Sequence, residues 1–250
     1  MRRGAIAACL LAAALTVCAT PRGWAEGSDG ADEHCRLALV LALDVSSSVD
    51  ALEYDLQRVG LAAALSAEEV RHAILSGAPG YVALSVFEWS GFHQHKLQLD
   101  WMALRSHADI DHASGVLAQM ARSHDDFPTS IGPALGYGAT LLERGPRCER
   151  RVIDVSGDGV NNYRYGPREA YRHFPFSDVT VNGLVILGDD PAVATYYATE
   201  VLQGTGAFLV VAQGFEEFRE AMTRKLYREI NDVILGAPAG ARPLFERPRG

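Results

Sequence analysis

Two acidic residues close apolar runs that lie more than a hundred residues apart in the chain. Asp44 ends the run LALVLALD, and Asp158 follows the run RVIDVSG. Ser46 and Ser48 come directly after Asp44, and Thr129 lies between the two runs, in the segment FPTSIGPAL. Two carboxylates and three hydroxyls at strand ends make an oxygen-only ligand set. Such a set suits Mg²⁺, Mn²⁺ or Ca²⁺ and argues against Zn²⁺ or Cu²⁺, so these five residues are the candidate metal ligands.

The five residues resemble the metal-ion-dependent adhesion site (MIDAS) of von Willebrand factor type A (VWA) domains. The pattern of that site is D-x-S-x-S, then a loop threonine, then Asp-Gly. This chain fills the pattern in order with Asp44, Ser46, Ser48, Thr129 and Asp158-Gly159. One departure is Pro128, because VWA domains usually have glycine before the threonine, and proline lacks a backbone donor. The resemblance implies hydroxyl ligation that leaves the cation an open position for a carboxylate of a partner protein.

Three later segments resemble an uncharacterised family of exported bacterial VWA-like proteins. They are VTVNGLVILGDDP, the pair Tyr196 and Tyr197, and GTGAFLVVAQGFEEF. This resemblance covers roughly residues 36–232. It implies a fold and an export route, and it implies no activity.

Apolar runs alternate with helical patterns along the chain. This alternation predicts a doubly wound α/β fold, with helices on both faces of a mostly parallel, six-stranded sheet. The strand at 95–100 alternates polar and apolar residues after a short turn, which is typical of an antiparallel edge strand. The expected strands are 37–44, 81–88, 95–100, 151–157, 179–187 and 207–212. The expected helices are 50–65, 107–122, 131–144, 167–173, 190–203 and 215–234.

The doubly wound strand order places strand 37–44 beside strand 151–157, at the switch point where ligands bind beyond the carboxyl ends of the strands. Asp44 and Asp158 lie at those ends, so the predicted position agrees with the predicted chemistry. Asp50 followed by Glu53 predicts a capping box that starts a helix directly behind the serines. The positive end of that helix dipole then points toward the same rim of the sheet.

Three residues that end the strand at 81–88 are candidates for a partner-binding rim: Glu88, Trp89 and Ser90. An exposed tryptophan there would anchor a partner, and the alternative is a tryptophan that packs in the core beneath the loop. Asp154, in the middle of a strand, is expected to have a buried structural partner, because an unpaired carboxylate is costly there.

The N-terminus has the composition of a secretory signal peptide, since two arginines precede an apolar stretch that is too short for a membrane span. Cleavage is expected after Ala25, with Ala19 as the alternative, and Val17 argues against lipidation at Cys18. The protein is therefore expected to be periplasmic or secreted. The expected organisation is a signal peptide at 1–25, a flexible segment at 26–35, one VWA-like domain at 36–235 and a flexible tail at 236–250.

Two cysteines remain after cleavage, and an oxidising compartment allows them to pair. Cys35 lies nine residues before Asp44, and Cys148 lies ten residues before Asp158. If both strands run parallel to a shared rim, both thiols lie at the opposite end, where neighbouring strands are about 4.8 Å apart. The spacing predicts a Cys35–Cys148 disulfide, and two unpaired thiols are the alternative.

The formal charge of −8 becomes −11 when the three arginines of residues 1–25 are removed. So acidic a chain, without a basic patch, is a poor candidate for binding nucleic acid or an anionic membrane. It contains no G-x-S-x-G, G-x-x-x-x-G-K-[ST] or H-x-x-x-H motif. The expected function is cation-dependent binding of an acidic group on a protein partner. The alternatives are a metal-assisted phosphohydrolase, with Arg164 or Arg168 on the phosphate, and a scaffold that uses no metal.

Overall fold

The computed structural model describes residues 34–76, 79–188 and 191–231. Its six strands form one sheet in the order β3-β2-β1-β4-β5-β6. Of these strands, β3 lies at an edge and runs antiparallel to its neighbour, while the other pairs are parallel, so the predicted fold class is confirmed. The predictions for the signal peptide, its cleavage and the tail concern residues outside these ranges. The strands are β1 (Cys35–Asp44), β2 (Tyr81–Trp89), β3 (His95–Leu104), β4 (Arg150–Gly157), β5 (Val179–Ile186) and β6 (Leu209–Ala212).

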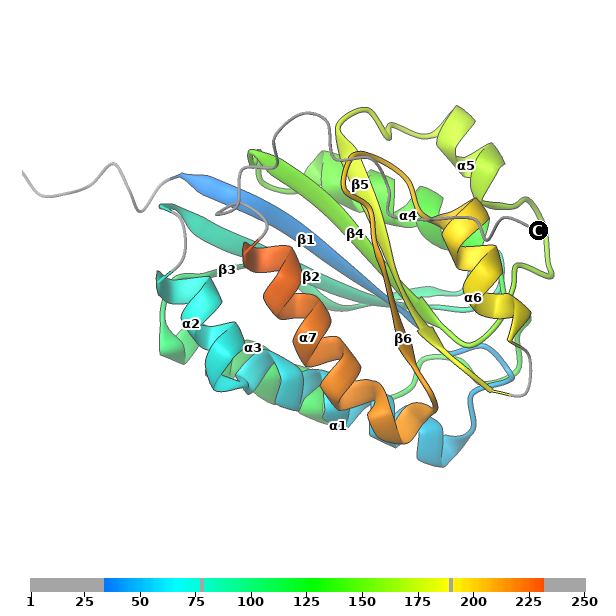
Figure 1. The fold of residues 1–250 in the computed structure, drawn as a ribbon, viewed down its shortest axis with the longest axis horizontal. Coiled ribbons are helices and arrows are strands. Elements are labelled where there is room, and N and C mark those ends of the chain that lie inside the picture. The colour runs from blue at the N-terminus through cyan, green and yellow to red at the C-terminus, as the bar shows by residue number, and fades with distance from the viewer. Residues whose placement is uncertain (1–33, 77–78, 189–190, 232–250) are drawn as a thin grey trace, which may run out of the picture.

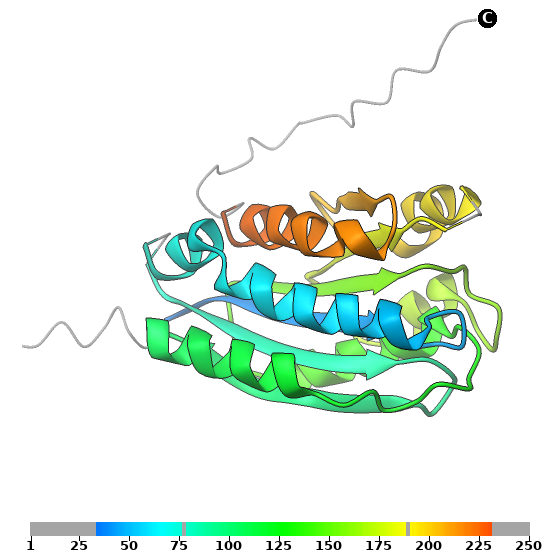
Figure 2. The ribbon, with the colours of Figure 1, turned by 90° about the horizontal axis from the view of Figure 1, so that it is seen from below.

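The helices cover both faces of the sheet (Figures 1 and 2). One face carries α1 (Ala51–Ser66), α2 (Glu68–Ser76), α3 (His107–Gln119) and α7 (Phe218–Asn231), the last preceded by the 3₁₀ turn η2 (Phe215–Glu217). The other face carries α4 (Ile131–Arg144), α5 (Pro167–His173), α6 (Ala192–Tyr196) and the π-helix η1 (Tyr197–Val201). None of the helices within the described ranges combines the length and apolar character needed to cross a membrane.

β1 lies in the middle of the sheet and is buried along its whole length. Leu39 and Leu41 belong to the core beneath α1 and α7, and Val40 belongs to the core beneath α4. Because both faces are covered, residues 37–43 of β1 are all apolar and do not alternate with polar residues.

The register of β1 and β4 confirms that these strands lie side by side. They pair in parallel, with Leu43 opposite Ser156. Parallel neighbours end at the same edge of a sheet, so Asp44 at the end of β1 and Asp158 just after β4 emerge at one rim.

Three elements differ from the sequence prediction. An additional helix, α2, follows α1, because the extended backbone of Ala67 (ψ 142°) interrupts the helical run. β3 continues four residues beyond position 100, to Leu104. The helix predicted at 190–203 is a short α6 that widens into η1, where the amide of Leu202 donates to the carbonyl of Tyr197.

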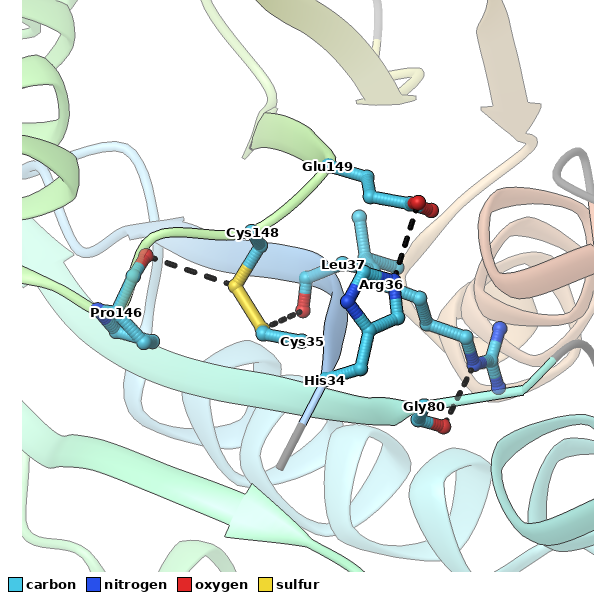
Figure 3. The surroundings of a disulfide bond; sticks show 8 residues. All are labelled: His34, Cys35, Arg36, Leu37, Gly80, Pro146, Cys148 and Glu149. Carbon is cyan, nitrogen blue, oxygen red and sulfur yellow. Dashed lines mark hydrogen bonds and ion pairs between the residues drawn. A yellow bond between two sulfur atoms is a disulfide. The ribbon is translucent and has the colours of Figure 1, made fainter. Parts of the chain in front are cut away.

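The predicted disulfide between Cys35 and Cys148 is present, with a Cα–Cα distance of 4.5 Å (Figure 3). It joins the first residue of β1 to the segment that enters β4, at the end of the strands away from the aspartates. Beside it, the ring of His34 lies 3.1 Å from the carboxylate of Glu149. The β1–β4 pair is therefore covalently joined at its amino end.

Asp154 has the buried structural partner that was predicted. Nζ of Lys225 in α7 lies 3.0 Å from Oδ1 of Asp154 and 2.6 Å from Oε1 of Glu229. Asn182 of β5 donates to the same Glu229 oxygen at 2.9 Å, and all four side chains are buried. Burial raises the pKa of Asp154, and Lys225 opposes this shift. The cluster fixes α7 to the middle of β4 and β5.

Candidate metal centre

The five predicted ligands come from three loops at the carboxyl edge of the sheet. β1 ends at Asp44, and the following turn carries Ser46 and Ser48. The predicted capping box then starts α1, since Asp50 accepts from the amide of Glu53 while the Glu53 carboxylate accepts from the amide of Asp50. Thr129 stands two residues before α4, and Asp158 follows β4 directly.

Hydrogen bonds connect the five residues into one network. The backbone amide of Ser46 donates to Oδ1 of Asp44 at 2.8 Å. The hydroxyls of Ser46 and Ser48 lie 3.2 Å apart, and Ser48 donates to Oδ1 of Asp158 at 2.8 Å. The Thr129 hydroxyl donates to that of Ser46 at 3.3 Å. Oxygen atoms of five residues between positions 44 and 158 therefore gather at one place.

The carboxyl groups of Asp44 and Asp158 make the site electrostatically favourable for a cation. Asp44 is fully buried, and its Oδ2 has no hydrogen-bond partner among the residues that the structure describes. Burial, reinforced by the nearby charge of Asp158, raises the pKa of Asp44 to about 8. Burial also raises the pKa of Asp158. A positive ion would relieve both effects, so the residues present fit a hard cation.

Hydroxyl groups would have to complete the coordination of such an ion. Within the described ranges, no three His, Cys, Asp or Glu side chains gather into a group able to hold a metal. The site has two carboxylates, Asp44 and Asp158, and its other oxygens belong to Ser46, Ser48 and Thr129. This composition differs from a carboxylate cage and from a nitrogen- or sulfur-rich transition-metal site.

Two side chains that the sequence analysis did not single out hold the Asp44 turn in place. Gln57 of α1 donates to the carbonyl of Asp44 at 3.0 Å. Arg122 donates to the carbonyls of Val45 and Ser46, at 3.1 Å each. Gln57 is fully buried on the inner face of α1, and a polar residue in that register was the available sequence signal.

The Thr129 loop is held by Asn162 through a reciprocal pair of hydrogen bonds. The amide of Thr129 donates to Oδ1 of Asn162 at 3.0 Å, and the amide of Asn162 donates to the carbonyl of Thr129 at 3.0 Å. Asn161 accepts from the amide of Gly132 at 3.2 Å. The asparagine pair thus shapes the loop after Asp158 and positions Thr129 despite Pro128.

The predicted partner-binding rim at Glu88, Trp89 and Ser90 is wrong, because all three residues are fully buried. Glu88 accepts from the hydroxyl of Tyr54 at 2.7 Å and from the amide of Ser123 at 2.8 Å. β2 lies between β1 and β3, and the loops of the site cover its end. These residues therefore lie buried beneath the loops of the site, and Trp89 packs in the core.

The two arginines considered for a phosphate site have other contacts. Arg168 pairs with Glu200 at 2.6 Å. The guanidinium of Arg164 lies over the rings of Phe92 and Tyr163, at 5.0 and 5.1 Å from their centroids. Neither contact places a guanidinium on the network around Asp158.

A family model described as a protein of unknown function, DUF1194, matches residues 34–234. The chain belongs to the DUF1194 family. The match spans all six strands of this DUF1194 chain and the three loops that meet at Asp44 and Asp158. A search of curated protein sequences gives no match.

Solved structures that resemble this DUF1194 chain include a von Willebrand factor type A structure, a protein with a MIDAS motif and a pilus adhesin. Proximal thread matrix protein 1 of the mussel byssus, with a zinc-occupied MIDAS motif, is 17% identical, with a TM-score of 0.55 over 80% of this chain and 47% of that chain. A von Willebrand factor type A structure from Catenulispora acidiphila is 16% identical, with a TM-score of 0.54 over 78% and 43%. The pilus adhesin SpaC of Lactobacillus rhamnosus GG is 14% identical, with a TM-score of 0.55 over 80% and 30%. This chain thus spans less than half of these proteins, and the likeness shows a VWA-like fold.

Proposed function

We propose that this DUF1194 protein is an exported binding module that uses a divalent cation, Mg²⁺ or alternatively Mn²⁺ or Ca²⁺, to engage an acidic group of a protein partner. The observation that carries the proposal is the buried, unpartnered Oδ2 of Asp44 beside oxygens from three loops. An isolated buried carboxylate is costly, and hard cations require several converging oxygens. A cation at this place satisfies both conditions.

The different burial of the five candidate ligands supports a binding role. Asp44, Ser46 and Thr129 are buried, whereas Ser48 is exposed and Asp158 is partly exposed. Asp44, Ser46 and Thr129 would hold the cation from the buried side, and the ion would supply a positive charge for an Asp or Glu carboxylate that approaches from the exposed side, near Ser48 and Asp158. The three hydroxyls are neutral, so they hold the ion without cancelling its charge.

Two further observations favour an exported adhesion-type module. The chain shares its fold with the pilus adhesin SpaC and with the mussel protein whose MIDAS motif holds zinc. The Cys35–Cys148 disulfide suits an oxidising compartment such as the periplasm or the exterior of the cell. Because the chain is acidic, our proposal includes neither binding to nucleic acid nor stable insertion into a membrane.

Thermal unfolding of the chain from residue 26 onward, with each cation or with EDTA, tests the proposal. Mg²⁺ at a hundred times its dissociation constant should stabilise the native state by about 2.7 kcal/mol. Asp44→Ala should abolish this shift, and so should Asp158→Asn. Asp111→Ala is the matched control, because Asp111 is an exposed acid that pairs with Arg71 away from the site. Parallel titrations with Mn²⁺, Ca²⁺ and Zn²⁺ identify the preferred ion.

The competing functions give different results in the same samples. A scaffold that uses no metal would show equal unfolding temperatures with Mg²⁺ and with EDTA, in wild type and in Asp44→Ala alike. The proposal assigns no enzymatic reaction to the protein. Hydrolysis of p-nitrophenyl phosphate that is lost in Asp158→Asn would contradict it and would favour the phosphohydrolase.

A further inference from the structure

Exposed apolar side chains lie close in sequence to the residues of the candidate metal centre, on each of its three loops. Within the described ranges, the exposed large hydrophobic residues include Leu52, Phe127 and Tyr163, at 68%, 36% and 42% exposure. Each lies close in sequence to a candidate ligand. Leu52 is in the first turn of α1, after Ser48. Phe127 is two residues before Thr129, and Tyr163 is in the loop after Asp158. We call these three residues the apolar collar. Apolar side chains around a polar centre are typical of a protein-binding surface.

The backbone of the collar is tied to the residues of the metal centre. The carbonyl of Phe127 accepts from the amide of Ser47 at 2.9 Å. The carbonyl of Tyr163 accepts from the hydroxyl of Ser130 and from Nδ2 of Asn161, at 3.3 Å each. The collar is therefore held in place before any partner arrives, which lowers the entropy cost of binding.

Arg164 adds a positive charge on one side of the collar. Its backbone is in the left-handed region, with φ 63°, a conformation that is costly for residues other than glycine and that clusters at functional sites. The guanidinium is exposed and lies over the rings of Phe92 and Tyr163. No carboxylate within the described ranges pairs with it. A guanidinium stacked in this way keeps its N–H edge available for a carboxylate.

The end of the collar at Phe127 is acidic, whereas Arg164 lies at Tyr163. Asp125 and Asp126 directly precede Phe127, and both are exposed. A partner with acidic residues would be repelled on that side and attracted at Arg164. The charges on the two sides thus favour one orientation of the partner across the metal centre.

We infer that the partner offers a short acidic segment with two carboxylates, one for the metal centre and one for Arg164, flanked by apolar side chains that pack on the collar. This inference rests on the proposed function and names the class of partner. It places the second carboxylate of the partner on the Tyr163 side and its apolar contact on Phe127 and Tyr163.

Two synthetic peptides test the inference by calorimetric titration into the chain from residue 26 onward with Mg²⁺. They are acetyl-Leu-Asp-Leu-Glu-amide and acetyl-Leu-Asp-Leu-Gln-amide, which differ by one carboxylate. Wild type should bind the two-acid peptide about tenfold more tightly. Arg164→Ala should remove that difference, whereas Arg168→Ala should keep it. The double variant Phe127→Ser with Tyr163→Ser should weaken both peptides about tenfold, and Tyr227→Ser, exposed on α7, should weaken neither.

The outcomes separate this inference from the proposed function, because stabilisation by Mg²⁺ alone is measured for every variant. If wild type responds to Mg²⁺ but binds neither peptide, or if Arg164→Ala still discriminates between them, the inference is overturned while the cation site stands. If wild type does not respond to Mg²⁺, the proposed function itself fails. Arg164→Ala with a normal Mg²⁺ response and no discrimination between the peptides supports the inference.

Discussion

The hydroxyl of Tyr197 and Oδ2 of Asp44 converge on the backbone of Gly157. A Cβ at Gly157 would lie 2.7 Å from the Tyr197 hydroxyl oxygen and 2.8 Å from Oδ2 of Asp44. Both oxygens are buried, and neither has a hydrogen-bond partner in the structure. Tyr197 starts the π-helix η1, and such wide turns occur frequently at functional sites. The absence of a side chain at Gly157 is therefore what leaves room for both groups behind the metal centre.

Gly157→Ala should weaken the response to Mg²⁺ because the new methyl group would displace Asp44. We expect a loss of at least about tenfold in Mg²⁺ affinity, together with about 1–3 kcal/mol in the free energy of unfolding. Mg²⁺ titration followed by urea denaturation measures both. Gly115→Ala in α3 is the control, because its Cβ would meet no described atom within 4 Å beyond the adjacent residues and backbone of its own helix, and it should keep the wild-type Mg²⁺ response. An unchanged response in Gly157→Ala would contradict the importance of this contact.

Without a divalent cation, the protein should become less stable as the pH rises. Burial and Asp158 raise the pKa of Asp44 from 3.8 to about 8, so between these values the native state holds a proton that the unfolded chain has released. In that window, this group lowers the free energy of unfolding by up to about 1.4 kcal/mol per pH unit. Urea denaturation in EDTA from pH 4 to pH 9 should show the decline.

Two variants of the pH experiment show whether Asp44 is responsible. Asp44→Asn should flatten the decline, and the part due to Asp154, whose pKa burial also raises, should remain. Adding Mg²⁺ to wild type should oppose the decline, increasingly so at higher pH. Equal slopes for wild type and Asp44→Asn in EDTA would show that Asp44 is already ionised in the native state.

Asn162→Ala should weaken Mg²⁺ binding even though Asn162 is not a predicted ligand. The change removes the acceptor for the amide of Thr129 and frees the loop that carries the Thr129 hydroxyl. Groups that orient metal ligands typically contribute about tenfold to a hundredfold in affinity. Asn162→Asp retains an acceptor oxygen and should keep most of the affinity in the same titration. If both variants bind Mg²⁺ as wild type does, Thr129 is positioned by other contacts.

Replacing both cysteines, Cys35→Ser with Cys148→Ser, should lower the free energy of unfolding by about 3–5 kcal/mol. The bond closes a loop with a sequence separation of 113 residues, which restricts the unfolded chain strongly. Urea denaturation of wild type with and without dithiothreitol should reproduce the difference. The double variant should keep its Mg²⁺ response, because the bond lies at the other end of β1 from Asp44. Loss of that response would mean that the two ends of the strand pair are coupled.

The sheet and the position of the five candidate ligands at one rim were predictable because they depend on local patterns. An apolar run such as residues 37–43 of β1 indicates a central strand, and Asp44, which follows this run, then marks the carboxyl edge. The disulfide was predictable for a related reason, since Cys35 and Cys148 stand at matching distances before the two aspartates. These inferences used the spacing of residues along the strands, together with the resemblance to VWA domains for the candidate ligands and the expected export for the disulfide.

The supports of the site were not predictable because their partners are distant in sequence. Gln57 and Arg122 bind backbone carbonyls of the Asp44 turn, and nothing in their own segments identifies those carbonyls. The wrong prediction of a partner-binding rim at Glu88, Trp89 and Ser90 has a similar cause. Trp89 is the last residue of β2, where a side chain is often exposed, yet loops from other parts of the chain cover it. Exposure at the end of a strand depends on those loops, and the strand itself does not encode it.

The buried charges of Asp154, Lys225 and Glu229 restrict how α7 can sit on the sheet. A helix that packs on a sheet through apolar side chains alone can shift along it at little cost, because one aliphatic neighbour substitutes readily for another. Moving α7 along its axis by one turn would separate Lys225 from Asp154. Each charge would then be buried without its partner, at a large desolvation cost. We infer that the cluster acts mainly by penalising mispacked compact states, so that the chain reaches one docking arrangement rather than several of similar energy.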